Sequence, residues 1–481
     1  MPFKHHVAQY QLGNGELRPE QRIVVGTRRG PKEPRRLAEH LGLSRQQPKT
    51  LITHRNWPNG EYLPTFMTKE CLPSKDGLRE ARADLFRYVP NYEKEGKQVW
   101  GEGLRGRTVY IVHTLSNSLS VQELEKRVEF IARTAKYNGA EHVSLIAYTL
   151  GHSAQERGSH ETENERMQTE KDKEKFDGQA VISRLQLQLY ATAGVDTIIT
   201  PQNHCPKETQ SLCDDVNEEF IPMQIQSREI NSTLRYHLDF VHVDLAPMLG
   251  YFISDYGGSH LGFDLSNSGE NVLFLCVDNG IYQDGFVQRA RQHSRLHNAA
   301  LAVLNKKRTE DGSKIDIIEL VHTEGLTEER GIEGMYVFGP DDEIRSGETM
   351  RKVFEVFRGQ TLEGLVRDPK IRGTPARIAA YAARTNFAGN SVDILSSPAI
   401  DDVVITNSDP RGLRNIGELD RKLQMLWINF MMAEAAKANE RGEDPSSILT
   451  PDYIREHDLL RVEVPHGHER FIRNGRKSGI I

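Results

Sequence analysis

The chain has 481 residues, of which 37% are hydrophobic and 27% charged, and its formal net charge is −6. This length predicts two or three domains, and the charge provides no general basic field for nucleic acid. No apolar run approaches the ~18–20 residues that span a bilayer, so we expect no membrane partner. The start of the chain lacks the apolar core of a signal peptide. The four cysteines form no C-x-x-C motif, so we expect neither a disulfide framework nor a zinc site. This cysteine usage predicts a cytoplasmic location.

In the first half of the chain, short apolar strands alternate with amphipathic helices. Strands are predicted at 22–26, 104–114, 141–148 and 195–200, and helices at 34–43, 120–138 and 178–193. Ser120 and Glu123 have the spacing of a capping box at the start of one helix. Because strand and helix alternate, the pattern predicts a parallel sheet covered on both faces. Two charged segments, 65–103 and 158–176, are interpreted as insertions.

The same alternation resumes in the second half. Strands are predicted at 271–278, 299–304, 315–322, 335–338 and 403–406, and helices at 285–297, 375–383 and 420–441. We therefore predict two α/β domains of one plan. The expected boundaries are 1–21 for an N-terminal extension, 22–245 and 246–450 for the two domains, and 451–481 for a C-terminal tail.

Residues 337–350 (V-F-G-P-D-D-E-I-R-S-G-E-T-M) carry a chemical pattern. An apolar strand leads to Asp341 and Asp342, whose carboxylates can accept hydrogen bonds from ribose hydroxyls. A polar turn then leads into a helix predicted to begin at Met350, where backbone N–H and hydroxyl groups can hold a phosphate. The turn consists of Arg345, Ser346, Gly347, Glu348 and Thr349. Taken alone, the pattern fits an acidic surface turn with Ser and Thr caps equally well.

Further short motifs follow one another along the chain. They are N-G-E at 59–61, L-R-G at 104–106, L-G-H-S-A-Q-E-R at 150–157, G-V-D at 194–196, R-A-R at 289–291 and N-K-K-R at 305–308. Their order, with the 337–350 stretch, resembles the ribose-phosphate diphosphokinase (phosphoribosyl pyrophosphate synthetase) family. The resemblance covers roughly residues 22–440. It implies an α/β fold with two phosphoribosyltransferase-like domains, each a mostly parallel sheet with helices on both faces.

The resemblance also implies a reaction, in which the β,γ-diphosphoryl group of ATP passes to the anomeric hydroxyl of ribose 5-phosphate with Mg²⁺ as cofactor. Lys306 and Arg308 are implied as catalytic cations, since Lys is a mobile point charge and Arg can bind phosphoryl oxygens in a bidentate way. The implied metal ligands are His204 and Asp278. The implied ATP-binding residues are Asn59, Glu61, Gln155, Glu156 and Arg157. The residues at 341–342 and 345–349 would hold the ribose and its phosphate.

Asn59 and Glu61 would reach ATP across a subunit interface, so the resemblance implies a homo-oligomer of even symmetry. The other implied partners are the small-molecule sugar phosphate and ATP.

The chain departs from the family pattern at several positions. Ala154 and Gln202 replace an Arg and an Asp, which favours a non-catalytic regulatory homologue as one alternative. Glu348 replaces a Gly of the usual Thr-Gly-Gly-Thr loop and adds a negative charge beside the expected phosphate dianion, whereas Arg345 adds a cation. Such a loop also suits a longer acceptor, and the other alternative is therefore ADP-ribose, giving ADP-ribose 1-pyrophosphate in NAD metabolism.

Overall fold

The computed structural model describes residues 16–27, 32–43, 52–56, 61–66, 93–94, 97–98, 104–116, 118–153, 180–230, 233–262, 265, 268–277, 282, 285–293, 295–308, 315–344, 346–360, 369–385, 387, 389–409, 411, 416–463, 472–473 and 476–477. Within these ranges, no helix combines the length and the apolar character needed to cross a membrane. The chain folds into two compact units, Met1–Val243 with Asn429–Ile448, and Asp244–Ile428 with Leu449–Ile481. The sequence pattern grouped residues 429–448 with the second half, but they fold into the first unit.

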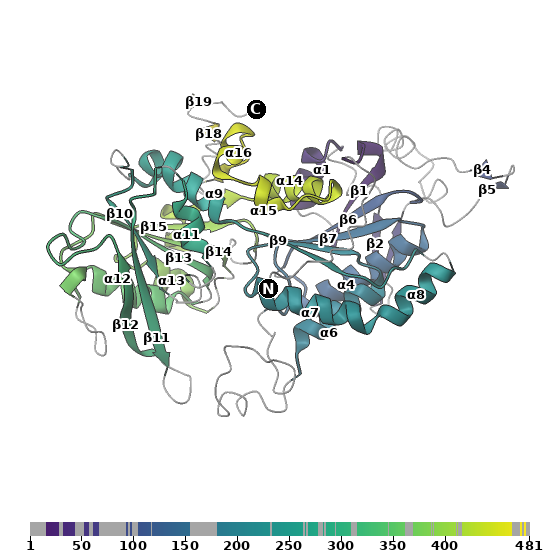
Figure 1. Ribbon diagram of the computed structural model, residues 1–481, viewed down its shortest axis with the longest axis horizontal. Helices are drawn as coiled ribbons and strands as arrows, with labels where there is room; N and C mark the ends of the chain where they lie inside the picture. The colour runs from purple at the N-terminus through teal and green to yellow at the C-terminus, as the bar shows by residue number, and fades with distance from the viewer. Residues whose placement is uncertain are drawn as a thin grey trace, which may run out of the picture. The chain divides into compact units, whose positions relative to one another are not determined.

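A five-stranded parallel sheet forms the centre of the first unit, in the order β1-β6-β7-β8-β9 (Figure 1). Its strands are β1 (Arg22–Gly26), β6 (Thr108–His113), β7 (His142–Ala147), β8 (Thr197–Pro201) and β9 (Asp239–Val243). Every residue of the first four is buried, as expected for parallel strands covered on both faces. The parallel sheet predicted from the alternation is confirmed. Two hairpins complete the strands of this unit: β2 (Ile52–Asn56) with β3 (Tyr62–Phe66), and β4 (Glu93–Lys94) with β5 (Lys97–Gln98).

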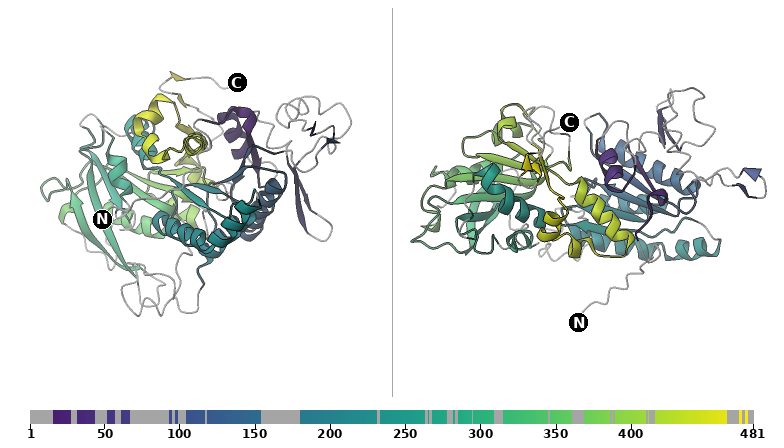
Figure 2. Two further views of the ribbon diagram at one scale, coloured as in Figure 1. Left: turned by 45° about the vertical axis from the view of Figure 1, so that its right-hand side comes forward. Right: turned by 90° about the horizontal axis from the view of Figure 1, so that it is seen from above.

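Helices cover both faces of this sheet. The helices of this unit are α1 (Glu33–His40), α4 (Val121–Tyr137), α6 (Ile182–Ala193), α7 (Pro206–Glu219), α8 (Ile221–Glu229), α14 (Asn429–Glu440) and α15 (Pro445–Ile448). Helices α4, α6 and α7 share one buried apolar cluster with the sheet, whereas α1 and α14 lie side by side on the other face (Figure 2). The predicted capping box of α4 is confirmed, because the backbone N–H of Glu123 donates to Ser120 Oγ and that of Ser120 donates to Glu123 Oε2, both at 3.1 Å.

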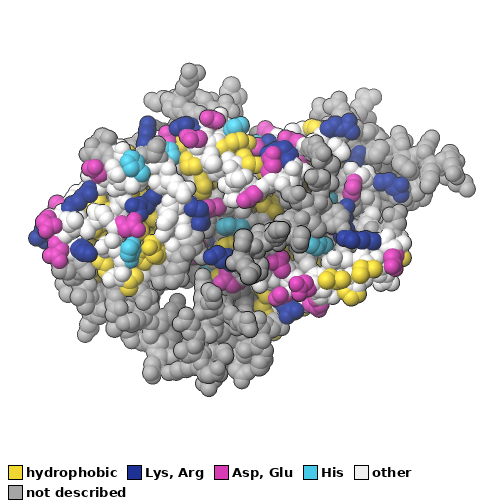
Figure 3. All heavy atoms as spheres, in the orientation of Figure 1, with side chains coloured by type: hydrophobic (Ala, Val, Ile, Leu, Met, Phe, Trp, Pro, Cys, Tyr) yellow, Lys and Arg dark blue, Asp and Glu magenta, His cyan; other side chains and the backbone are white. Residues whose placement is uncertain are grey.

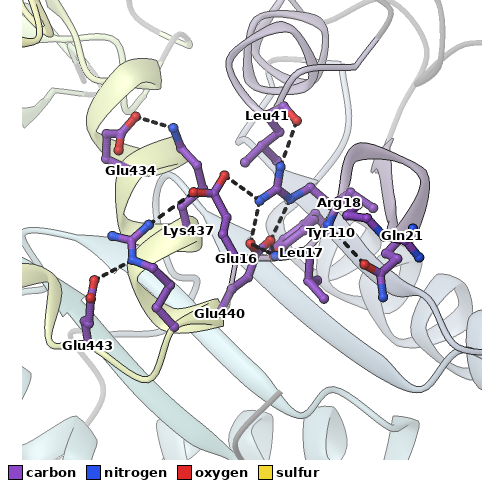
Figure 4. Close-up of polar contacts among 12 residues, drawn as sticks. Glu16, Leu17, Arg18, Gln21, Leu41, Tyr110, Glu434, Lys437, Glu440 and Glu443 are labelled. Atoms are coloured by element: carbon purple, nitrogen blue, oxygen red, sulfur yellow. Dashed lines mark hydrogen bonds and ion pairs between the residues drawn. The ribbon is translucent and has the colours of Figure 1, made fainter. Parts of the chain in front are cut away.

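A buried ion pair ties the end of α14 to the first strand of this unit (Figure 4). Arg22 Nη2 lies 2.6 Å from Glu440 Oε2, and Arg22 Nε donates to Glu440 Oε1 at 2.8 Å. Their side chains are 3% and 1% exposed. The Tyr110 hydroxyl of β6 donates to the same carboxylate at 2.5 Å. Arg22 and Glu440 are 418 residues apart in sequence, so a late segment of the chain completes the first unit.

Helix α8 differs from its neighbours because its large apolar residues face solvent. Ile221, Met223 and Ile225 are 46–52% exposed, and hydrophobic side chains gather where α8 lies, at the lower edge of the first unit (Figure 3). Of its residues, Ser227 is the buried one. The helix contacts α7, and its Gln224 and Ser227 side chains donate hydrogen bonds to the carbonyl oxygens of Tyr236 and Leu234.

The second unit contains an eight-stranded sheet in the order β12-β11-β10-β13-β14-β15-β16-β17. Its strands are β10 (Val272–Cys276), β11 (Ala300–Arg308), β12 (Ile315–Glu324), β13 (Tyr336–Ile344), β14 (Arg377–Thr385), β15 (Asp402–Thr406), β16 (Leu423–Trp427) and β17 (Arg461–Glu463). The outermost pairs, β11–β12 and β16–β17, are antiparallel, and all pairs between them are parallel. The prediction of a mostly parallel sheet is confirmed here too. A further hairpin is formed by β18 (Ile472–Arg473) and β19 (Arg476–Lys477).

Side chains on β13 and β14 show how helices cover the two faces of this sheet. The rings of Phe338 and Tyr381 contact each other at a tilt, and Tyr381 stacks with Phe286 of α11. On the opposite face, a Cβ at Gly339 would lie 2.5 Å from Phe354 of α12, so glycine lets that helix pack closely. The helices of this unit are α9 (Ala246–Tyr251), a π-helix (Phe252–Leu261), α11 (Phe286–Arg291), α12 (Glu348–Phe357), α13 (Ser391–Leu395) and α16 (Pro451–Glu456).

Two helix predictions in the second half were wrong. The segment predicted as a helix at 375–383 is strand β14, and its alanines favour a helix locally but here line a strand between β13 and β15. The helix predicted at 420–441 is two elements, strand β16 followed by α14. Ile428 separates them, and the apolar run before it joins the sheet beside β15.

Candidate active site

The acidic pair lies at the carboxyl end of β13, in the interior of the second sheet. The strand continues through the acids to Ile344 rather than ending before them as predicted. Asp341 Oδ1 accepts a 2.9 Å hydrogen bond from the backbone N–H of Asp342, which fixes the first carboxylate beside the chain. Both acids are half-buried. In open α/β sheets, ligands bind outside the carboxyl ends of the strands, so this edge is a candidate site.

An arginine on the neighbouring strand offsets the charge of these acids. Arg384 of β14 lies opposite Glu343 in the parallel register. Its Nη2 is 3.3 Å from Asp342 Oδ2 and 3.9 Å from Glu343 Oε2, and its side chain is 6% exposed. A second arginine, Arg411, holds Asp409 with Nε 2.9 Å from Oδ1 and Nη2 2.6 Å from Oδ2. The edge therefore combines carboxylates with ordered guanidinium groups.

The turn after β13 brings a helix start next to the acids. Helix α12 begins at Glu348, two residues before the predicted start at Met350. Gly347 precedes it with φ +76°, and a Cβ there would lie 2.9 Å from Leu395 Cδ2, so both the conformation and the space require glycine. Ser346, Gly347, Glu348 and Thr349 all lie at this helix start, whereas Arg345 is outside the described residues.

The carboxylate of Glu348 turns along its own helix. Arg351 donates from Nη2 to Glu348 Oε1 at 2.7 Å and from Nε to Oε2 at 3.1 Å. Lys352 Nζ lies 3.7 Å from the same carboxylate. The hydrogen bonds from Arg351 hold the pKa of Glu348 below its usual value. The negative charge of Glu348, which was expected beside the phosphate site, is thus paired with two cations of the same helix.

Lys306 and Arg308 lie on a two-stranded ribbon. Strand β11 pairs with β10 from Ala300 to Val303 but continues to Arg308 in antiparallel pairing with β12. The N-K-K-R motif at 305–308, which follows the strand predicted at 299–304, is therefore part of strand β11, and this two-stranded ribbon extends beyond the β10 pairing (Figure 1). The side chains of both cations are outside the described residues.

His204 lies in the first unit, between the end of β8 and the start of α7, and is half-buried. Gln202 nearby has φ +35°. Among the described residues, no group of three or more His, Cys, Asp or Glu side chains is arranged to hold a metal ion. Asp278, Asn59, Gln155, Glu156 and Arg157 are outside the described residues.

Glu61 is exposed at the start of β3, in the β2–β3 hairpin. The next residue, Tyr62, stacks on Phe130 of α4 with ring centroids 6.4 Å apart. Arg127 of the same helix lies 4.4 Å from the centre of the Tyr62 ring, a cation–π geometry. The hairpin is thus fixed on α4 of its own unit.

Comparisons with known proteins show what this arrangement resembles. No protein-family model matches the chain. The ribose-phosphate pyrophosphokinase of Haemophilus ducreyi is 30% identical over 166 residues, covering 34% of this chain and 45% of the relative. The enzymes of the same name from Pasteurella multocida and Neisseria meningitidis are 29% identical over 167 residues and 25% identical over 176 residues, covering 45% and 46% of those relatives. The crystal structure of phosphoribosylpyrophosphate synthetase from Mycobacterium smegmatis matches 87% of this chain and 98% of its own with a TM-score of 0.53 at 15% identity.

Over about a third of its length, this chain is similar in sequence to ribose-phosphate pyrophosphokinases. The structural match establishes the shared fold of two phosphoribosyltransferase-like domains. The sequence matches span less than half the length of the curated relatives.

The first unit has polar residues at its sheet edge that the motifs did not reveal. They lie at or just after the ends of four parallel strands, as Thr27 after β1, His113 in β6, Tyr148 after β7 and Asn203 after β8. Each is at most 3% exposed and has a polar side-chain atom without a hydrogen-bond partner among the described residues. Unpaired buried polar atoms are rare. In the sequence, these residues could have been found only by their position at the ends of predicted strands, because no short motif contains them all.

Proposed function

We propose that this chain is a ribose-phosphate pyrophosphokinase. The anomeric hydroxyl of ribose 5-phosphate would attack the β-phosphorus of ATP, the bond from that phosphorus to the α,β-bridging oxygen would break, and AMP would leave. One observation carries the proposal: Asp341 and Asp342 lie at the carboxyl end of β13, and the turn after them leads directly into α12. The relatives' name, ribose-phosphate pyrophosphokinase, supports the same reaction.

The proposed sugar seat has two parts. The carboxylates of Asp341 and Asp342 accept hydrogen bonds from the ribose hydroxyls. The backbone N–H groups at the start of α12 bind the 5-phosphate, since a helix N-terminus carries partial positive charge. Arg351 donates a hydrogen bond to Glu348, which weakens the repulsion of the phosphate that favoured the ADP-ribose alternative. Arg345, the other residue behind that alternative, lies outside the described residues. Ribose 5-phosphate is therefore the acceptor we propose.

Mg²⁺ fits the donors at this edge. It binds through one or two carboxylates and substrate phosphates rather than in an all-protein cage, and Asp341 and Asp342 supply such oxygens. When bound, Mg²⁺ neutralises charge on the phosphoryl oxygens. We assign Lys306 and Arg308 to charge that develops on the transferring group, and His204 to the ATP phosphates or their metal. The homo-oligomer with ATP at a subunit interface stays a prediction.

The test is to incubate the protein with ATP and Mg²⁺, offer ribose 5-phosphate and ADP-ribose in parallel, and identify products by mass spectrometry. We expect AMP and phosphoribosyl pyrophosphate from ribose 5-phosphate. Asp341→Asn should abolish most of this activity. Asp393→Asn, which removes an exposed carboxylate of α13, is the matched control and should retain it. A protein that binds ATP and the sugar without releasing AMP would be the regulatory homologue instead.

A further inference from the structure

A buried polar cluster lies beneath the turn that follows β7, and the proposed reaction gives it no role. His113 at the end of β6, Glu125 near the start of α4 and Tyr190 of α6 are 0–2% exposed. The Tyr190 hydroxyl donates to Glu125 Oε2, and His113 Nε2 lies 3.5 Å from Glu125 Oε1. Among the described residues, neither ring nitrogen of His113 nor Glu125 Oε1 has a hydrogen-bond partner. Burying a carboxylate without full hydrogen bonding costs folding free energy. The position of Glu125 therefore calls for an explanation.

The same oxygen of Glu125 fills the space beside the turn. A Cβ at Gly151 would lie 2.0 Å from Glu125 Oε1 and 3.2 Å from Val121 Cγ1. Glycine alone lets the backbone approach α4 this closely. A carboxylate, rather than an apolar side chain, therefore determines how near the turn lies to the helix.

The turn is also tied to α6. Ser183 Oγ donates to the carbonyl oxygen of His152 at 2.5 Å, and His152 has φ +59°, a region that non-glycine residues adopt when the surroundings hold them there. Tyr190 belongs to the same helix and binds the other oxygen of Glu125. The turn and the carboxylate are thus fixed by one scaffold of α4 and α6.

Movement of the turn and the His113–Glu125 contact are coupled through a single atom. Because a Cβ at Gly151 would overlap Glu125 Oε1, a shift of the turn toward α4 would displace the oxygen that faces His113 Nε2. Conversely, loss of the carboxylate leaves an empty space into which the turn can move. The turn lies at the carboxyl edge of the first sheet, where ligands of open α/β sheets bind.

We propose that Glu125 is a positioning residue that sets the turn Leu150–Ser153, with His113 and Tyr190 holding its carboxylate, and that this turn shapes the edge which receives the ATP phosphates. The inference rests on the proposed function, since that function assigns His204, which follows β8 at the same edge, to the ATP phosphates or their metal. The residues proposed for the sugar phosphate belong to the other unit, so the effect of Glu125 is specific to ATP.

Titration calorimetry with ATP and steady-state kinetics together test this inference. In Glu125→Ala, we expect ATP affinity to fall about tenfold, while the KM of ribose 5-phosphate and kcat change less than about twofold. Glu125→Gln keeps the size of the side chain and should recover most of the affinity. Gly151→Ala forces a methyl group against Glu125 and should weaken ATP binding in the same direction.

Glu129→Ala is the matched control. Glu129 lies one helical turn beyond Glu125, is 8% exposed, and also faces α6, where Gln186 Nε2 donates to it at 3.4 Å. Its removal should leave ATP affinity unchanged.

Wild-type ATP affinity in both Glu125→Ala and Gly151→Ala would overturn the inference. An equal loss in Glu129→Ala, or a parallel rise in the KM of the sugar, would also overturn it, because either result indicates general loosening. If Glu125→Ala does not fold, Glu125→Gln and Gly151→Ala decide the question. A wild-type protein that binds ATP but releases no AMP contradicts the proposed function alone, whereas one that binds no ATP overturns both.

Discussion

The two α/β units build their polar edges by different routes. In the second unit, one continuous run from Asp341 to Glu348 supplies the acids, the turn and the helix start. In the first unit, the polar edge collects single residues from the ends of four strands, and α14 arrives from 418 residues away to pair with Arg22. A contiguous motif can be recognised in sequence because its spacing is local. A dispersed edge becomes visible when the fold brings the strand ends together.

Breaking the long-range contact should have the largest effect on stability. Glu440→Gln removes the carboxylate that pairs with Arg22 and leaves a buried guanidinium without its main partner, at a cost of about 3–5 kcal/mol. Urea unfolding measures the loss. Glu443→Gln, on an exposed pair just after the same helix, should cost under about 1 kcal/mol. Equal midpoints for the two variants would contradict the dependence of the first unit on α14.

Substitutions at Lys306 and Arg308, on the β11–β12 ribbon, test whether residues outside the Asp341–Glu348 run take part in the reaction. Lys306→Ala and Arg308→Ala should each lower kcat with sugar binding nearly intact, a loss of about 2–4 kcal/mol of transition-state stabilisation. Lys307→Ala, between them, is the control with a small expected effect. Turnover equal to wild type in both variants would remove these residues from the catalytic assignment.

Substitution of Arg384 tests whether this arginine of β14 supports sugar binding by the acids of the neighbouring strand β13. Arg384→Met leaves the carboxylates of Asp342 and Glu343 without their guanidinium, so an anionic sugar should bind about 1.4 kcal/mol more weakly, a tenfold rise in KM. Arg384→Lys should recover part of this. Arg377→Met breaks a similar pair with Asp402 at the other end of β14, and should leave the KM of the sugar unchanged. A change in KM for Arg377→Met but not for Arg384→Met would refute the assignment.

The Glu348–Arg351 pair should give the smallest effect. Because the pKa of Glu348 is lowered by Arg351, the pair adds stability above the usual glutamate pKa, and this stability is lost as pH falls through the lower folded-state pKa. Half-exposed pairs are screened, so the gain is under about 1 kcal/mol. The stability difference between wild type and Glu348→Gln should therefore shrink between pH 7 and pH 3. A difference that grows on acidification would contradict the pairing.

Much of the fold could be predicted from the sequence, since alternating strands and helices and the Ser120 capping box are local patterns. The orientation of Glu348 could not. A helix start predicted at Met350 placed Glu348 outside the helix, whereas the actual start at Glu348 puts Arg351 three residues on and on the same face. The strand β14 was missed because local alanine propensity favours a helix, and pairing with β13 and β15 outweighs it.

The return of α14 to the first unit also has a consequence for synthesis. The first unit is translated first, but its covering helix emerges from the ribosome after residues 244–428 have been made. At 5–20 residues per second, that delay is roughly 10–40 s. During this interval Arg22 lacks Glu440, and the sheet face that α14 covers is exposed. We therefore expect the nascent chain to present apolar surface that a chaperone can bind. Helix α14 therefore joins the first unit after most of the second unit has been made, and residues Leu449–Ile481 of the second unit follow it.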